Sequence, residues 1–305
     1  MLQMLIGTNV PFMKFRHWAY LFSGLLIVST IVWLVVHHGP YYSVDFTGGT
    51  VLQIRTSQVL QADQVRRTLD RAGFAGFELQ QMNGVGTEGE YLLRFKGETK
   101  DAFRDVQDAL EKSFSGLKVE LRSHVMVGPR VGNELRQKAL WAVLWSLGGI
   151  LLYVGLRYEF KFAFGAVVAL FHDVFIVLGA LCFTGREVSL TVIAALLTIA
   201  GYSINDTIVV FDRIRERSKE LRKEKHSRAM DIAVNETLSR TVITALTVFL
   251  AALGLFIWGG EVLRDFSFAM LVGTVFGTYS SVYVASALAL ETWIILDRRK
   301  GIQAE

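Results

Sequence analysis

The stretch VSLTVIAALLTIAGYSINDTIVVF, residues 188–211, is apolar along almost its whole length and carries one charged residue, Asp206. A helix needs roughly 20 predominantly apolar residues to cross the ~30 Å hydrocarbon core of a bilayer. The stretch therefore predicts a membrane-spanning helix that contains an acid. An aspartate near the centre of such a helix costs about 2.5–3.5 kcal/mol on insertion, so its presence calls for a functional or structural reason.

Five further stretches have the same character. Hydrophobic residues make up 52% of the 305-residue chain and the mean hydropathy is +0.38, values that favour a membrane protein. The stretch nearest the N-terminus, residues 18–36, is longer than the roughly 7–15 residues of a signal-peptide core, so we interpret it as a retained anchor. Cys182 is the single cysteine, which excludes an intrachain disulfide. We predict a polytopic α-helical membrane protein with six spans, at residues 18–36, 139–156, 162–185, 188–211, 241–260 and 266–293.

The basic residues predict the orientation of these spans. Nine Lys and Arg residues lie between Arg213 and Arg240, and three more, at 298–300, follow the last span. The positive-inside rule then places both termini, 1–17 and 294–305, and a basic, amphipathic loop at 212–240 in the cytoplasm. Beside a span, such a basic run indicates topology and contact with membrane lipids rather than binding of nucleic acid.

The same orientation leaves residues 37–138 outside the cytoplasm as one domain between the first two spans. Alternating apolar residues predict strands at 50–56, 76–82, 90–96 and 117–127, and helical periodicity predicts helices at 62–73 and 100–114. A Gly-rich turn, NGVGTEG at 83–89, separates the second and third strands. The order βαββαβ predicts a ferredoxin-like α+β domain.

Two acids inside the spans are the candidate functional residues. Asp173, in ALFHDVFIV, lies near the middle of the third span, and Asp206 lies nearer the cytoplasmic end of the fourth. Arg240, at the cytoplasmic start of the antiparallel fifth span, is expected at a similar depth to Asp206 and so is a candidate partner for it. If the two moved apart, the carboxylate would switch between holding and releasing a proton. Neighbouring polar side chains that could support these acids are Asn205, His172, Ser203 and Thr244.

Two other interpretations of the acids remain open. Asp206 with Arg240 could be a purely structural ion pair, and His172 with Asp173 a buried hydrogen-bonded dyad. An intramembrane aspartyl protease would also place two aspartates on adjacent spans. Here, however, the residues around the two acids are FHD and SIND, which are not the motifs of those enzymes, and the two acids lie at different depths in the membrane. The sequence contains no Walker motif, phosphate loop or Cys/His metal cluster, so we expect no catalytic residues, no metal, no cofactor and no enzyme activity.

Motifs along the whole chain resemble the SecF family of protein-export membrane proteins, within the resistance-nodulation-division (RND) superfamily. The motifs are VDFTGGT (44–50), VGPRVGNELRQKAL (127–140), FHDV (171–174), AGYSINDTIVVFDRIRE (200–216), NETLSRTVITALT (235–247) and GTYSSVYVASALAL (277–290). Considered without the resemblance, Gly48 and Gly49 are explained by a turn into the first strand. Gly128 and Pro129 are explained by a stiff linker into the second span. The resemblance makes these four residues and Asp45 family signatures.

The resemblance implies an RND-type half of six spans that pairs with SecD. It further implies association with the SecYEG channel in the inner membrane and use of the proton motive force to promote translocation of preproteins. In these terms Asp206 matches the family's essential intramembrane aspartate, Arg240 its arginine, and Asp173 a further family-typical aspartate.

Two alternatives to this function stay open on the residues alone. One is a proton-coupled RND-type transporter half that moves a small molecule. The other is a structural subunit whose charges only hold the helices together.

Overall fold

The computed structural model describes residues 8–74, 77–82, 88–95, 101–221 and 224–299. It divides into two compact units, a sheet unit at Tyr42–Leu140 and a helical unit formed by the rest of the described chain. The sequence predicted the separate domain at 37–138. Most of the predicted Gly-rich turn at 83–89, and parts of both predicted terminal tails, lie outside the described residues.

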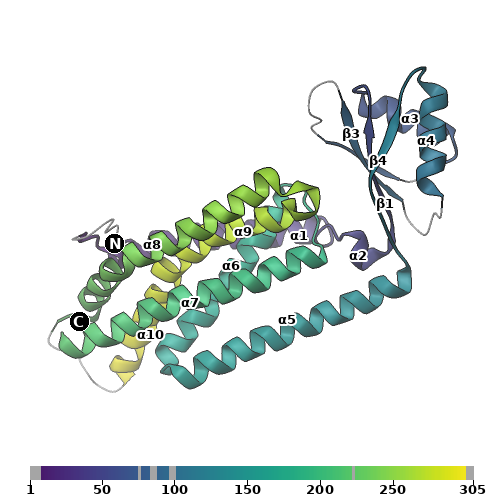
Figure 1. Ribbon diagram of the computed structural model, residues 1–305. Coiled ribbons are helices and arrows are strands. Elements are labelled where there is room, and N and C mark those ends of the chain that lie inside the picture. Colours follow the sequence, from purple (N-terminus) through teal and green to yellow (C-terminus); the bar gives the residue numbers. More distant parts are fainter. Residues whose placement is uncertain (1–7, 75–76, 83–87, 96–100, 222–223, 300–305) are drawn as a thin grey trace. The chain divides into compact units, whose positions relative to one another are not determined.

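The sheet unit contains the predicted alternation of strands and helices. After a short helix, α2 (Val44–Thr47), its elements are β1 (Gly49–Thr56), α3 (Ala62–Arg71), β2 (Glu78–Met82), β3 (Gly89–Phe95), α4 (Ala102–Ser113) and β4 (Val119–Val127). The four strands form one antiparallel sheet in the order β2-β3-β1-β4 (Figure 1). Leu52 in the central strand β1 pairs with Leu93 on one side and with His124 on the other.

The core of this unit follows from the alternation in β1 and β3. Leu52, Ile54, Tyr91 and Leu93 are fully buried and pack with the apolar stripes of α3 and α4, which include Val106. The Tyr91 hydroxyl satisfies both backbone groups of Leu60, at 2.6 Å each, and burial raises the pKa of this tyrosine above its usual value. A polar tip buried in this way is tolerated because its hydrogen bonds are made.

The helical unit supplies the membrane spans. Its helices are α1 (Arg16–Val36), preceded by a 3-10 turn at Phe12–Phe15, the membrane part of α5 (Pro129–Arg157), α6 (Phe160–Phe183), α7 (Leu190–Glu220), α8 (His226–Trp258), α9 (Gly260–Ser280) and α10 (Ser286–Arg299). A π-helical turn, Ser281–Ala285, joins α9 to α10. Among the described residues six helical segments are long and apolar enough to span a membrane. The chain is a membrane-embedded protein with multiple spans.

The segment 212–240, predicted as a basic, amphipathic connection between two spans, is mostly helical. Helix α7 continues to Glu220, and α8 already begins at His226. Ion pairs one turn apart, from Arg213 to Glu216 and from Arg217 to Glu220, stabilise the polar end of α7. Both arginines also contact Glu236 on α8, so the two helices stay paired beyond their apolar parts.

Small residues let the central helices approach closely. Helix α9 packs against α6, α7 and α8 (Figure 1). A Cβ atom on Gly273 would lie 2.4 Å from the Ile199 side chain of α7, and one on Gly165 of α6 would lie 2.5 Å from the Ala285 carbonyl oxygen. These contacts put α6, α7 and α9 at the centre of the unit, where the candidate acids lie.

Candidate functional site

Asp173 lies on α6 with its carboxylate completely enclosed, at 0% exposure. His172 Nδ1 is 2.9 Å from Asp173 Oδ1, and the hydroxyls of Ser203 on α7 and Ser280 on α9 both donate to Oδ2, the latter at 2.8 Å. A buried carboxylate is stable only when its oxygens accept hydrogen bonds. Both oxygens of Asp173 have hydrogen-bond partners, from side chains on three helices.

The network around Asp173 continues to α1. His172 Nε2 is 3.0 Å from Ser23 Oγ, which is 3.1 Å from the Tyr279 hydroxyl, and Tyr279 donates to the Ala19 carbonyl oxygen at 3.0 Å. Ser23, Tyr279 and Ser280 are residues that the sequence did not single out, although Tyr279 and Ser280 lie in the motif at 277–290. The hydrogen-bonded chain therefore joins four helices through one histidine–aspartate pair.

Asp206 lies on α7 and is also buried, with 3% of its surface exposed, but it has a different environment. Its Oδ2 atom, the Tyr202 hydroxyl and Thr241 Oγ1 are buried and make no hydrogen bond within the described parts of the chain. Tyr202 lies close enough to Asp206, Thr244 and Thr278 to interact with them, but not with the geometry of a good hydrogen bond. Three unpaired polar groups from α7 and α8 are thus buried inside the helical unit.

Arg240 does not form the direct ion pair with Asp206 that the sequence suggested. Its side chain is exposed, and it makes no ion pair with the Asp206 carboxylate in the described structure. It nevertheless lies near enough to interact electrostatically with that carboxylate. An exposed arginine keeps its head group solvated, so Arg240 lies beside the site without neutralising it.

The four supporting side chains separate into different places. Ser203 and His172 both bind Asp173 rather than Asp206. Asn205 is exposed, although it precedes Asp206 in the chain, because adjacent residues point about 100° apart on a helix. Thr244 donates to the carbonyl oxygens of Arg240 and Thr241 at 3.0 Å each and lies near Tyr202.

The signature residues near the first strand form a compact turn in the sheet unit. Asp45 is in α2, and Gly48 and Gly49 have φ angles of 70° and 139°, a backbone that favours glycine. A Cβ atom on Gly49 would lie 2.6 Å from the Phe95 carbonyl oxygen. Gly128 and Pro129 lead into α5, where Gly132 packs against the same turn, since a Cβ atom there would lie 3.1 Å from the Gly48 nitrogen. These residues support backbone packing.

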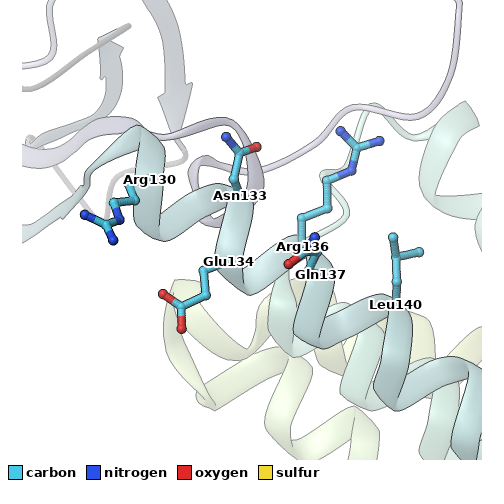
Figure 2. Close-up of a pocket in the computed structure, with 6 residues that line it drawn as sticks. All are labelled: Arg130, Asn133, Glu134, Arg136, Gln137 and Leu140. Atoms are coloured by element: carbon cyan, nitrogen blue, oxygen red, sulfur yellow. The ribbon is translucent and has the colours of Figure 1, made fainter.

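A hollow of about 540 Å³ lies along the first turns of α5, next to this turn. Figure 2 shows the side chains that line it fanning out from successive turns of one helix: Arg130, Asn133, Glu134, Arg136, Gln137 and Leu140. Glu134 pairs with Lys138 at 2.8 Å, and the Arg136 guanidinium lies 6.0 Å from the Tyr42 ring. All six lining residues are exposed, so the hollow has the character of a solvated helix face.

Comparison with known proteins identifies relatives along nearly the whole chain. Residues 105–294 match the protein family described as protein export membrane protein SecD/SecF, C-terminal, and residues 33–58 match the SecD/SecF GG motif. The protein translocase subunit SecF of Thermodesulfovibrio yellowstonii is 40% identical over 294 residues, which cover 95% of this chain and 97% of the relative.

Two further similarities involve a longer protein. The protein translocase subunit SecDF of Thermus thermophilus is 43% identical over 286 residues, 92% of this chain and 38% of that protein. The crystal structure of SecDF from the same organism, described as a translocon-associated membrane protein, matches with a TM-score of 0.84 and 39% identity. The match covers 94% of this chain and 39% of that chain.

Proposed function

The chain belongs to the SecD/SecF family of protein-export membrane proteins, and from that premise we propose that it uses the proton motive force to promote preprotein translocation. Family membership makes it a protein translocase subunit of the SecD/SecF assembly, whose two parts are fused in the Thermus thermophilus relative. The mechanism, the energy source and the further partners are the substance of the proposal.

The observation that carries the proposal is the unpaired environment of Asp206. A buried polar group without a hydrogen-bond partner costs about 1–3 kcal/mol, and inside a bilayer the protein has no solvent to compensate it. Asp206 Oδ2, the Tyr202 hydroxyl and Thr241 Oγ1 form such a group within the described residues. An acid kept in this state is suited to exchange a proton, since protonation removes its charge.

The energy available to such an acid is large enough to drive a conformational change. One proton moving through a membrane potential of 100 mV releases about 2.3 kcal/mol. Arg240, near Asp206 but not paired with it, favours the charged carboxylate when it approaches and allows protonation when it withdraws. Asp206 and Arg240 are therefore the proposed coupling pair, and Asp173 is the proposed second acid.

The proposal includes the topology and the partners. The chain is placed in the inner membrane with both termini in the cytoplasm and the sheet unit on the outer face, as the distribution of Lys and Arg suggests. We assign the sheet unit to the ferredoxin-like fold, because its βαββαβ order and β2-β3-β1-β4 sheet are those of that motif. The SecYEG channel, the moving preprotein and membrane lipids are the expected partners, and the work is transport with no covalent chemistry and no bound cofactor.

Asp206→Asn tests the function directly. The native complex, with its SecD partner, is assayed in membrane vesicles for the stimulation of preprotein export by an imposed proton gradient. We expect the variant to accumulate normally and to lose the stimulation, because asparagine cannot exchange a proton. Asp212→Asn, at the half-exposed end of the same helix, is the matched control and should keep it.

Three outcomes would contradict the proposal. Full gradient stimulation in Asp206→Asn would exclude Asp206 as the coupling acid. A variant that only fails to accumulate would favour the structural role for this charge. Recovery of the native chain without a SecD partner would instead favour small-molecule transport.

A further inference from the structure

Two adjacent serines, where α9 ends and the π-helical turn Ser281–Ala285 begins, contact Asp173 and the residue that follows Asp206. Ser280 and Ser281 are both completely buried. The Ser280 hydroxyl donates to Asp173 Oδ2 at 2.8 Å. The next hydroxyl, that of Ser281, is 3.0 Å from Thr207 Oγ1, and Thr207 directly follows Asp206.

Both serine hydroxyls also lie near an acceptor on their own helix, since the Gly277 carbonyl oxygen is 3.1 Å from the Ser280 hydroxyl and 2.9 Å from the Ser281 hydroxyl. When the Ser281 hydroxyl donates to Gly277, its oxygen accepts the proton of Thr207. Successive residues on a helix point about 100° apart. One dipeptide can therefore contact α6 through Ser280 and α7 through Ser281.

Close packing keeps this dipeptide in place. A Cβ atom on Gly277, one turn earlier, would lie 3.4 Å from Ser203 Cβ and 3.8 Å from Asp173 Oδ2, both van der Waals distances, so α9 packs closely against these two residues here. On the other side, the Ser286 hydroxyl donates to the carbonyl oxygen of Ser281 at 2.8 Å, five residues earlier. Isolated π-helical turns within α-helices are frequent at functional sites, where they change the register of the side chains.

We propose that Ser280 and Ser281 are positioning residues that couple the two acids. Ser280 holds the Asp173 carboxylate, and Ser281 holds the turn of α7 that bears Asp206, so a displacement of that turn is passed through one rigid stretch of α9 to Asp173. From there the His172–Ser23–Tyr279 chain passes it to α1. This inference rests on the proposed function, in which the charge of Asp206 changes during the cycle.

A spectroscopic test detects this coupling without an export assay. The carboxyl infrared band of Asp173 in the purified full-length complex is assigned by its loss in Asp173→Asn. We expect Ser280→Ala to shift this band, because one hydrogen bond to the carboxylate disappears, and Asp206→Asn to shift it at a distance. In the double variant Asp206→Asn with Ser281→Ala, the distant shift should be absent.

Ser267→Ala is the matched control. Ser267 is also completely buried on α9, but its hydroxyl donates at 2.6 Å to the Leu263 carbonyl oxygen of its own helix. It should leave the Asp173 band and gradient-stimulated export unchanged, whereas Ser280→Ala and Ser281→Ala should each lower the stimulation at least about fivefold. If Ser280→Ala does not accumulate, Ser280→Cys, which is similar in size and a weak donor, replaces it.

The results separate the coupling from the function. An Asp173 band that does not respond to Asp206→Asn, or that still responds after Ser281→Ala, overturns the coupling even if export depends on Asp206. Gradient-stimulated export that is unchanged in Asp206→Asn overturns the proposed function. The infrared measurement then still decides whether the serines couple the two acids. Ser280→Ala and Asp173→Asn should also be non-additive in export, and additive losses would contradict a shared action.

Discussion

Asp173 and Asp206 are the same residue type, on adjacent helices of one bundle, and they have opposite hydrogen-bonding environments. Both oxygens of Asp173 have hydrogen-bond partners, on three helices, whereas Asp206 keeps a buried oxygen unpaired, as do the hydroxyls of Tyr202 on α7 and Thr241 on α8, within the described residues. Burial alone therefore does not define a functional acid. An acid with all its bonds made is held in place, and one with bonds missing can change its state.

The contrast arises from what the neighbouring helices present. Helix α9 directs Ser280 toward Asp173, and α7 contributes Ser203 to the same carboxylate. Around Asp206, the Tyr202 hydroxyl is near the carboxylate but makes no good hydrogen bond within the described residues, and Thr244 donates to the backbone of its own helix. Arg240 stays exposed. Hydroxyls lie near both acids, but only those near Asp173 make hydrogen bonds of good geometry to the carboxylate.

The largest effect should come from breaking the complete network. Asp173→Ala removes the hydrogen-bond partner of His172 Nδ1, Ser203 and Ser280 at once, and within the described residues only Ser280 keeps another acceptor, the Gly277 carbonyl oxygen at 3.1 Å. We expect a loss of about 3–5 kcal/mol in stability, seen as reduced accumulation and a lower unfolding temperature of the purified protein. An unchanged unfolding temperature would show that these hydrogen bonds contribute little.

Removing the carboxylate of the other acid, Asp206, should stabilise the protein instead of destabilising it. Asp206→Leu replaces a partly unpaired polar group by an apolar one of similar size, so we expect the protein to become about 1–2 kcal/mol more stable. Gradient-stimulated export should be lost in the same variant. The pair of measurements, a higher unfolding temperature and no stimulation, would be contradicted if Asp206→Leu were as unstable as Asp173→Ala.

In the described structure Arg240 interacts electrostatically with only one of the two acids, Asp206. Arg240→Met should reduce gradient-stimulated export about tenfold by removing the charge that acts on Asp206. Arg240→Lys keeps the charge and should retain more of the stimulation. The unfolding temperature of both variants should stay near that of the native protein, because the side chain is exposed, and equal export in the two variants would exclude a role for the charge.

The smallest effect is expected for a carboxylate in water, Glu111 of the sheet unit. The Gln107 side chain, at 2.9 Å, and the Val119 amide hold the pKa of this carboxyl below its usual value. Because the folded pKa is the lower one, the stabilisation is complete above the unfolded pKa of about 4.3 and disappears as the pH falls through the folded value. Glu111→Gln should remove this small contribution, measured as the pH dependence of the unfolding temperature of the full-length protein between about pH 6 and pH 3. The same pH dependence in the variant would contradict the assignment.

Much of the fold could be predicted because it depends on local patterns. Runs of apolar residues are long enough to define the spans, and alternation in Gly49–Thr56 and Gly89–Phe95 is enough to define strands with one buried face. The resemblance to the SecF family is likewise confirmed by the matches at residues 105–294 and 33–58. Beyond the predicted span at 188–211, the polar end of α7 is stabilised by ion pairs rather than by apolar residues.

The positions of Asp173 and Asp206 inside membrane spans follow from the sequence alone, since a long apolar stretch that contains a charged residue can be recognised without knowledge of tertiary contacts. Which of the two acids has its hydrogen bonds made depends on the tertiary structure. Ser280 is 107 residues from Asp173 in the chain, and Arg240 is exposed and makes no ion pair with Asp206 in the described structure, although its depth suggested it as the partner. Hydrogen bonds depend on the rotation of each helix about its axis, and that rotation is set by packing, where Gly277 brings α9 to within reach of α6 and α7.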